Sequence, residues 1–493
     1  MIVAMLIITL TAMGDVAPPT VHAGNDELHA YLMEAAQNHP ELQAKYETWK
    51  AKMERVPQVK SLDDPMFTYG QFLQSDLNRF KVAFAQKFPW FGTLRDRGNK
   101  AAAEADAALS DFYNTRNRIF ANVKQAYFNY AYLKDQLDVI DSELKLYKFI
   151  EDTTRSRYAL GLARDDELRD AQIRLSEEQD RRSHVLDYRP ALSAQLAETL
   201  GRVSGDVLPW PKSAKLPSAP PPAPVVVARV RTINPSIKAY DSLIHSAEMG
   251  IKLAKKAGYP NFTLGVDFTS VSKPRQIRPD RPYPASLNAA RNLYRTATGQ
   301  MPYDRVQTAI NGYALGTTDE PMAYSNGGDD NIMVSLTMTL PIWRKKVHAG
   351  IAEAKYKEQS VERMRERQAQ KLGAAARMAI YQWKDAKRRE KLYKDDLIPQ
   401  AQLAYQSLQS SYSTGLLPEV TDVLDAIDRT LQFGLEERKA VRDMQNAAAQ
   451  LEYLMGGSWE TGEAANKETG AKKESAPAKA EPPKEIEATG AGK

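Results

Sequence analysis

The feature that most constrains the fold of this chain is an internal repeat. Residues 157–162 (RYALGL) correspond to residues 411–416 (SYSTGL), 254 residues later. The openings and closings of the two halves correspond as well: 38–40 with 233–235, and 200–201 with 454–456. Self-similarity over so long a period indicates two copies of one structural unit. We therefore expect one tandem repeat rather than a series of unrelated domains.

The offset between the two copies is not constant. It is about 195 residues at the openings and 252 residues between the segments 88–90 and 340–342, which places an insertion of roughly 60 residues in the second copy. The predicted organisation is a signal peptide (1–23), a first repeat (24–202), a Pro-rich linker (203–230) that should be extended at 218–224, a second repeat (231–457) with a long surface loop (271–330), and a disordered tail (458–493).

The N-terminus has the pattern of a secretory signal. Its first 13 residues are mostly apolar, which is too short to span a membrane, and 21–23 is a small-x-small cleavage site. No lysine or arginine precedes the apolar run. The alternatives are a start codon that lies further upstream or a buried segment.

Composition excludes several classes of protein. Charged residues make up 26% of the chain, and no later stretch is apolar for the 18 or more residues that a spanning helix needs, so a multi-helix membrane protein is excluded. A β-barrel is not excluded, because its strands are short and alternate. The net charge of +5 comes from 67 basic and 62 acidic residues, a balance that gives no footprint for nucleic acid.

Nothing in the sequence indicates catalysis. The chain has no cysteine, which removes disulfides, thiolate metal sites and cysteine nucleophiles. The six histidines are scattered without the spacing of metal ligands, and no phosphate-binding loop is present. The methionines are more typical of packing than of metal binding. We expect no enzyme activity, no cofactor and no metal site.

Four segments alternate with the period of two that β-strands show: 66–73, 80–88, 261–271 and 332–340. In the third, phenylalanine, leucine and valine alternate with threonine, glycine and aspartate. One apolar face and one small polar face is the pattern that lipid outside and water inside would select. The alternative is a soluble, half-buried sheet.

Long stretches of strong helix formers follow each predicted strand pair. Residues 94–158 contain no proline and a single glycine near their start, and a helix of that length spans roughly 100 Å at 1.5 Å per residue. A second helix is predicted from 165 to 200, a third from 346 to 397, and a fourth from 419 to 454. Pro399 should kink or break the third. Helices this long must lie side by side as a coiled coil.

Four strands with a lipid-type face cannot form a complete barrel in one chain. About eight strands is the practical minimum, and an open sheet edge in lipid would leave backbone groups without partners. Two or more chains should therefore share one barrel.

The chain resembles the TolC-like outer-membrane efflux factors. The resemblance rests on the signal peptide, the tandem repeat, the strand pairs that feed long helices, the Tyr-x-x-Gly-Leu segment in both halves and, above all, residues 421–426 (TDVLDA). Residues 86–92 also resemble the branch that serves heavy-metal efflux. The resemblance implies a mainly α fold with a membrane β-barrel, built as a homotrimer with a 12-stranded barrel over an α-helical tunnel.

The same resemblance implies a location, partners and a role. The protein would sit in the outer membrane, in contact with lipid, and extend into the periplasm. It would be the passive exit duct of a tripartite efflux system, with a periplasmic adaptor and an inner-membrane pump of RND type. The alternatives are the outer-membrane component of type I protein secretion and, from another class, a soluble coiled-coil scaffold.

The candidate site lies at the two helix-tip turns, which contain Gly161 and Leu162 in the first half and Gly415 and Leu416 in the second. Asp422 and Asp425 are three residues apart, so they share one helix face, and in a symmetric trimer they would form an acidic ring. The plainer reading is that acids in a first turn suit the helix dipole.

The family resemblance makes this ring the periplasmic gate. It adds Tyr412 with Asp166 or Glu167 as the contacts that hold the tips shut. The resemblance also implies an arginine that helps to hold the tips closed. At the position where that arginine might stand, this chain has Pro418.

Overall fold

A computed structural model of the chain describes residues 26–73, 78–203, 205–212, 216–271, 330–413 and 419–459. The predicted signal peptide, the interior of the 271–330 loop, the tail beyond 459, and the turn that contains Gly415, Leu416 and Pro418 lie outside these residues. The chain divides into two units: one comprises 1–55, 100–248 and 356–493, and the other comprises 56–99 and 249–355.

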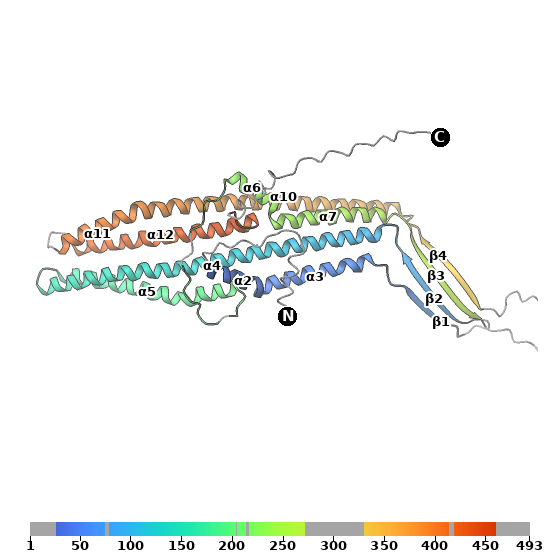
Figure 1. Cartoon of the computed structure of the whole chain (residues 1–493), viewed down its shortest axis with the longest axis horizontal. Coiled ribbons are helices and arrows are strands. Elements are labelled where there is room, and N and C mark those ends of the chain that lie inside the picture. Colours follow the sequence, from blue (N-terminus) through green and yellow to red (C-terminus); the bar gives the residue numbers. More distant parts are fainter. Residues whose placement is uncertain are drawn as a thin grey trace, which may run out of the picture. The chain divides into compact units, whose positions relative to one another are not determined.

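The second unit contains a four-stranded antiparallel sheet (Figure 1). Its strands are β1 (Met66–Gln71), β2 (Asn78–Phe88), β3 (Asn261–Val271) and β4 (Asn331–Thr339), and they pair in chain order. All four predicted strands are therefore present. The sheet joins the strand pair of the first repeat to that of the second through the pairing of β2 with β3.

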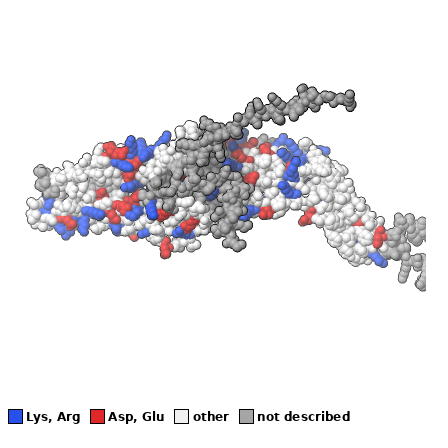
Figure 2. Space-filling view, in the orientation of Figure 1, with Lys and Arg blue, Asp and Glu red and all other residues white. Residues whose placement is uncertain are grey.

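The strand register sorts the side chains into two faces. Phe84 lies opposite Phe67 on one side and Val266 on the other, and Val266 lies opposite Val334. Residues directly opposite each other share a face, so these apolar side chains lie together. They are also exposed: Phe67 by 68% and Val334 by 69%. On the face seen in Figure 2 the strands carry few charged side chains.

The other face of the sheet is small and polar. Lys81 of β2 and Asp267 of β3 form an ion pair of 3.4 Å there, among alanine, glycine, serine and threonine side chains. The predicted alternation of an apolar and a polar face is confirmed.

Each strand adjoins a helix along the chain. Helix α3 (Pro40–Lys60) precedes β1, α4 (Thr93–Ala159) follows β2, α7 (Pro235–Lys256) precedes β3, and α10 (Arg344–Leu392) follows β4. The absence of helix breakers predicted one helix over 94–158. Helix α4 confirms this prediction, because it runs unbroken for 67 residues.

The remaining helices belong to the first unit. They are α2 (Asp26–Asn38), α5 (Asp165–Thr199), α6 (Ala223–Ile233), α11 (Ile398–Ser413) and α12 (Val420–Met455). In Figure 1, α5 runs back beside α4 and α12 runs back beside α11, so the unit contains two long helical hairpins. No helix among the described residues combines the length and the hydropathy needed to span a membrane.

The third long helix continues past Pro399, but it is irregular there. A π-helical turn, η2 (Tyr393–Leu397), links α10 to α11 and ends two residues before the proline. Proline has no N–H and its ring crowds the carbonyl four residues earlier. The wider π turn relieves this crowding while the helix continues.

The linker prediction is wrong in its last part. Residues up to Pro224 were expected to be extended, yet α6 begins at Ala223. A proline in the first helical turn is harmless because its missing N–H has no partner there anyway. Val226 and Val230 are fully buried and pack in a core cluster with Trp383. Their burial at helical spacing outweighs the local preference of the proline run.

The closing glycines of the two repeats make the same contact. Gly201 and Gly456 both have φ of +78°. A Cβ on Gly201 would lie 2.9 Å from the carbonyl oxygen of Asn38, and one on Gly456 would lie 3.3 Å from Pro235. Each repeat therefore ends against its own opening, and only glycine combines this backbone conformation with so close an approach.

Candidate functional site

The first helical hairpin ends in a glycine turn. Gly161 has φ of +72°, and the N–H of Leu162 donates to the carbonyl of Arg157 over 2.8 Å. This six-to-one hydrogen bond and a left-handed glycine form the common C-terminal cap of an α-helix. Arg157 and the turn are thereby fixed with respect to each other.

Tyr412 lies in the last turn of α11, directly before the part of the second tip that is not described. Only 2% of its surface is exposed. Its hydroxyl lies 2.9 Å from the Thr154 hydroxyl of α4, and its ring lies under the guanidinium of Arg157, which is 4.5 Å from the ring centroid. The residue therefore joins the second hairpin to the first.

Arg157 connects three structural elements. Its Nη1 donates to the carbonyl of Tyr412 over 2.6 Å, and its Nη2 donates to the carbonyl of Leu162 over 3.4 Å. The guanidinium thus satisfies the C-terminal end of α11 and the turn after its own helix α4. A cation at two helix C-termini is also favoured by the helix dipoles.

A second contact between the hairpins involves Asp428 of α12. Arg174 of α5 lies 2.9 Å from Asp428 and 3.6 Å from Asp425, and the hydroxyl of Tyr147 donates to Asp428. Tyr147 is fully buried, whereas Asp425 is 57% exposed. Asp428 therefore serves the packing of the tip, and Asp425 remains accessible to solvent.

Asp422 is the least engaged of these acids. It lies in the first turn of α12, is exposed, and forms no ion pair with any residue that the structure describes. Asp422 and Asp425 are both exposed and three residues apart, so they lie on one face of the helix. Both carboxylates on that face are accessible to solvent.

Asp166 and Glu167 do not contact Tyr412. Both pair with Arg164, the residue before α5, at 3.1 Å and 3.5 Å. Burial raises the pKa of Tyr412, and the Glu167 carboxylate contributes in the same direction, against the opposing effects of Thr154 and Arg157. Glu167 is therefore a neighbour of the tyrosine, whereas Asp166 is 64% exposed.

The residues that bind Tyr412 are not evident from the sequence alone. Arg157 stands inside the repeated segment, at the position where the second copy has Ser411. A basic residue in the last turn of a helix was the available signal. Thr154 and Arg174 carry no such signal, because their roles depend on contacts between distant parts of the chain.

Two buried carboxyl groups lie behind the tip. Glu143 of α4 and Glu178 of α5 are 8% and 3% exposed, and each has one oxygen without a hydrogen-bond partner among the described residues. Burial, together with the charge of Glu178, raises the pKa of Glu143 to about 7. Burial also raises the pKa of Glu178, although Arg181 lies 3.0 Å from it. The pair therefore favours at least one protonated carboxyl.

No described part of the chain brings three or more histidine, aspartate or glutamate side chains into an arrangement that could hold a metal ion. The features of the tip are thus contacts between hairpins, exposed carboxylates and buried acids.

Comparisons with known proteins agree with this architecture. The family model for outer membrane efflux proteins matches residues 32–202 and 226–457. A curated relative, the toxin and drug export protein A of Aggregatibacter actinomycetemcomitans, is 26% identical over 191 residues. That match covers 37% of this chain and 40% of the relative, so it spans less than half of either protein.

Solved structures show the same fold. The channel protein CusC superposes with a TM-score of 0.67 at 14% identity, covering 88% of this chain and 93% of that one. The outer membrane protein VceC of Vibrio cholerae superposes with a TM-score of 0.64 at 14% identity, covering 88% and 97%. Since the two family matches together take in most of both repeats, this chain belongs to the outer membrane efflux protein family, which places it in the outer membrane.

Proposed function

We propose that this protein is the passive exit duct of a tripartite efflux system. The observation that carries the proposal is the four-stranded sheet, which has an exposed apolar face and leaves one edge each of β1 and β4 unpaired among the described residues. Backbone groups on a sheet edge need partners in lipid. Further copies of the chain supply them, and three copies give a 12-stranded barrel with the long helices as a tunnel.

The tips of the hairpins form the gate in this proposal. In a trimer, Asp422 and Asp425 of each copy contribute to rings of carboxylates, and rings of that kind select cations. The contacts of Tyr412, Arg157 and Arg174 join the two hairpins of one copy and hold the tip narrow. Asp166 and Glu167 lie at the other turn, where they face a neighbouring hairpin.

Opening requires these contacts between hairpins to separate. An inner-membrane pump of RND type supplies the energy, and a periplasmic adaptor transmits it by binding outside the tips. The duct itself performs no chemistry and passes its cargo without using energy of its own. The name of the curated relative includes both toxins and drugs, and we propose that this duct also exports toxins and drugs. Secretion of protein is the second candidate.

Single-channel recording in a planar bilayer tests the proposal. Protein extracted with detergent should give a small, steady, cation-selective conductance that a trivalent cation blocks from the tip side. The double variant Asp422→Asn, Asp425→Asn should lose most of the block and the selectivity. Glu362→Gln, which removes an exposed carboxylate from α10, is the matched control and should behave as the wild type.

Two outcomes would contradict the proposal. An unchanged block in the double variant would remove the carboxylates from the gate. Protein that leaves cells without detergent and never conducts would indicate the soluble coiled-coil scaffold instead.

A further inference from the structure

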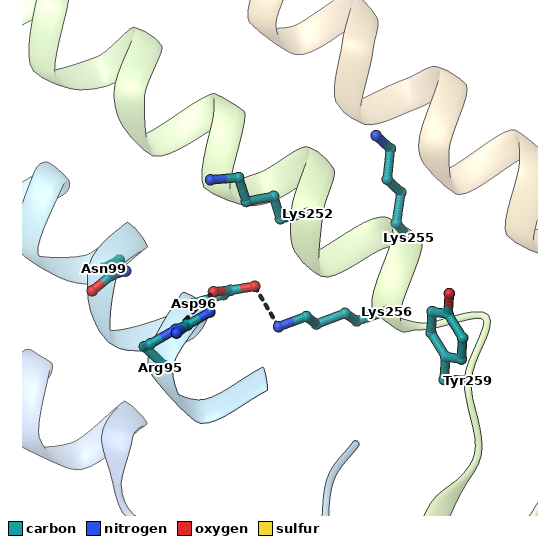
Figure 3. Close-up of a pocket in the computed structure, with 7 residues that line it drawn as sticks. All are labelled: Arg95, Asp96, Asn99, Lys252, Lys255, Lys256 and Tyr259. Carbon is teal, nitrogen blue, oxygen red and sulfur yellow. Dashed lines mark ion pairs between the residues drawn. The ribbon is translucent and has the colours of Figure 1, made fainter. Parts of the chain in front are cut away.

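A cavity of about 560 Å³ lies where the sheet of the second unit meets its helices (Figure 3). Helix α4 contributes Arg95, Asp96 and Asn99, helix α7 contributes Lys252, Lys255 and Lys256, and Tyr259 lies between α7 and β3. All of these residues belong to the same unit. The proposed exit duct assigns this cavity no role.

The cavity has a strong excess of positive charge. Four cationic side chains line it against a single carboxylate, which leaves a formal surplus of three charges. The buried Asp96 is 2.7 Å from Lys256 and 3.7 Å from Arg95. Lys252 and Lys255 are exposed and form no ion pair with any described residue.

Asp96 organises this group of cations. Only 6% of its side chain is exposed, so its charge acts mainly on Lys256. The Lys256 ammonium is also held near the backbone, because a Cβ on Gly92 would lie 2.8 Å from it. Lys256 is therefore held in place by its ion pair with Asp96 and by its position near Gly92. Lys252 and Lys255 are two further ammonium groups on the same helix whose charge is available to an anion.

An aromatic stack connects the cavity to the apolar face of the sheet. The ring of Tyr259 lies 4.9 Å from that of Trp90, and Trp90 lies 6.1 Å from Phe262. Phe262 is in register with Phe88 and with Met338, so it belongs to the apolar face. The cationic cavity and the exposed apolar surface are thus connected through Tyr259 and Trp90.

Exposed aromatic residues mark the same level of the unit. Phe91 is 79% exposed and Trp343 is 73% exposed, at the points where β2 and β4 give way to helices. Tryptophan and other aromatic side chains favour the level of the lipid headgroups, where one end of the ring is apolar and the other is wet. A cationic cavity at this level is suited to a phosphate group.

We propose that this cavity binds the phosphate headgroup of a phospholipid in the periplasmic leaflet of the outer membrane. The phosphate lies against Lys252, Lys255 and Lys256, Asn99 donates from its amide, and the acyl chains follow the apolar face beyond Tyr259. An amphipathic ligand uses both surfaces, whereas free phosphate uses only the cavity. The proposal rests on the outer-membrane placement and on the apolar face meeting lipid, but not on the gate.

Native mass spectrometry of the full-length oligomer in detergent tests this site, with phosphatidylglycerol as the probe. The double variant Lys252→Gln, Lys255→Gln removes two charges and keeps the Lys256–Asp96 pair. The variant loses two ammonium groups that contact the phosphate, and contacts of this charge-assisted kind are the stronger ones, so it should bind at least about tenfold more weakly. The control variant Lys345→Gln, Lys346→Gln removes two exposed lysines at the start of α10 that do not line the cavity, and it should lose less than about twofold.

Three results would overturn the proposal. Equal losses in both variants would indicate general attraction to the surface, and no loss in either would place the lipid elsewhere. Displacement of the lipid by an equal concentration of inorganic phosphate would mean that the cavity takes free phosphate.

The melting temperature of the cavity variant should match that of the wild type, and its bilayer conductance should be unchanged. If the wild-type protein did not conduct, that result would contradict the proposed duct and would not bear on the lipid site.

Discussion

Tyr158 and Tyr412 occupy the same position in the two repeats but have opposite environments. Tyr158 is 45% exposed at the end of α4, whereas Tyr412 is 2% exposed at the end of α11. The residue before Tyr158 is Arg157, and its guanidinium lies over the ring of Tyr412 instead. The residue before Tyr412 is a serine. The two repeats therefore differ at corresponding positions: the first hairpin supplies the guanidinium of Arg157, and the second supplies the ring of Tyr412 that it covers.

This asymmetry suits a gate made of two different hairpins. If each hairpin held the other through the same set of contacts, the two hairpins would have to separate together. In this chain the contacts concentrate on Tyr412 and Asp428 of the second hairpin, and the first hairpin supplies Arg157, Thr154 and Arg174. The second hairpin is thus the element whose release we expect to open the duct.

Removal of the two tyrosines should give the largest difference between the tips. Tyr412→Ala deletes a buried aromatic ring and the hydrogen bond to Thr154, which should cost about 4 kcal/mol of local stability. Tyr158→Ala removes an exposed ring and should cost less than about 0.5 kcal/mol. Hydrogen exchange of residues 147–160 and 398–412 measures both. Equal effects of the two substitutions would contradict the asymmetry.

Glu143 should make the tip region sensitive to pH. Its pKa rises from the ordinary 4.5 to about 7 in the folded protein, so the folded state holds an extra proton between these values. Stability that is present below pH 4.5 is therefore lost as the pH rises towards 7, by a total on the order of 3 kcal/mol. Glu143→Gln cannot ionise and should remove the part of this slope that Glu143 contributes.

Thermal unfolding in detergent at a series of pH values between 4.5 and 8 measures the slope. Glu362→Gln, an exposed substitution on α10, should keep the slope of the wild type. Identical pH profiles for Glu143→Gln and the wild type would mean that the buried carboxyl does not titrate in this range.

Arg157 should have an intermediate effect. Arg157→Ala removes charge-assisted hydrogen bonds to two carbonyls and the contact with the ring of Tyr412, for a loss of about 2 kcal/mol. Arg157→Lys keeps the charge but not the planar fork, so it should recover only part of the loss. Arg169→Ala removes an exposed arginine that pairs only with Asp165 among the described residues, and it should leave exchange at the tips unchanged. Full recovery by lysine would mean that charge alone matters.

Asp425 and Asp428 both lie near Arg174, and their substitutions should show the smallest difference in stability. Asp428→Asn weakens a partly buried ion pair and the hydrogen bond from Tyr147, for a loss of about 1 kcal/mol. Asp425→Asn weakens a longer pair at a more exposed carboxylate and should cost about 0.3 kcal/mol or less. Urea unfolding followed by tyrosine fluorescence resolves the order. A larger loss for Asp425 would make it a packing residue rather than an accessible acid.

The fold was predictable from sequence where the pattern is local. Alternation in 261–271 and 332–340 predicts strands, and the absence of breakers in 94–158 predicts a helix. Each of these signals lies within the element that it predicts. The proline-rich run before Ala223 misled because the preference of proline is also local, and α6 forms through the burial of Val226 and Val230 against distant helices.

The candidate site was predictable only in part. Tyr412 and the acids of α12 stand out in the repeated segment and in the TDVLDA run. Their partners do not, because Arg157 and Tyr412 are 255 residues apart and meet only when the two hairpins pack. The same holds for Tyr147 and Asp428, which are 281 residues apart. A single sequence gives the type of residue at a tip but not which tip residues bind one another.

The most direct test of the account is the single-channel conductance of a variant in which the hairpins are no longer joined. Tyr412→Phe with Arg157→Ala keeps the buried ring and removes the hydrogen bonds to Thr154, Tyr412 and Leu162. We predict a conductance several times that of the wild type, with the block by a trivalent cation retained because Asp422 and Asp425 are untouched. A conductance equal to that of the wild type would contradict the claim that these contacts hold the duct closed.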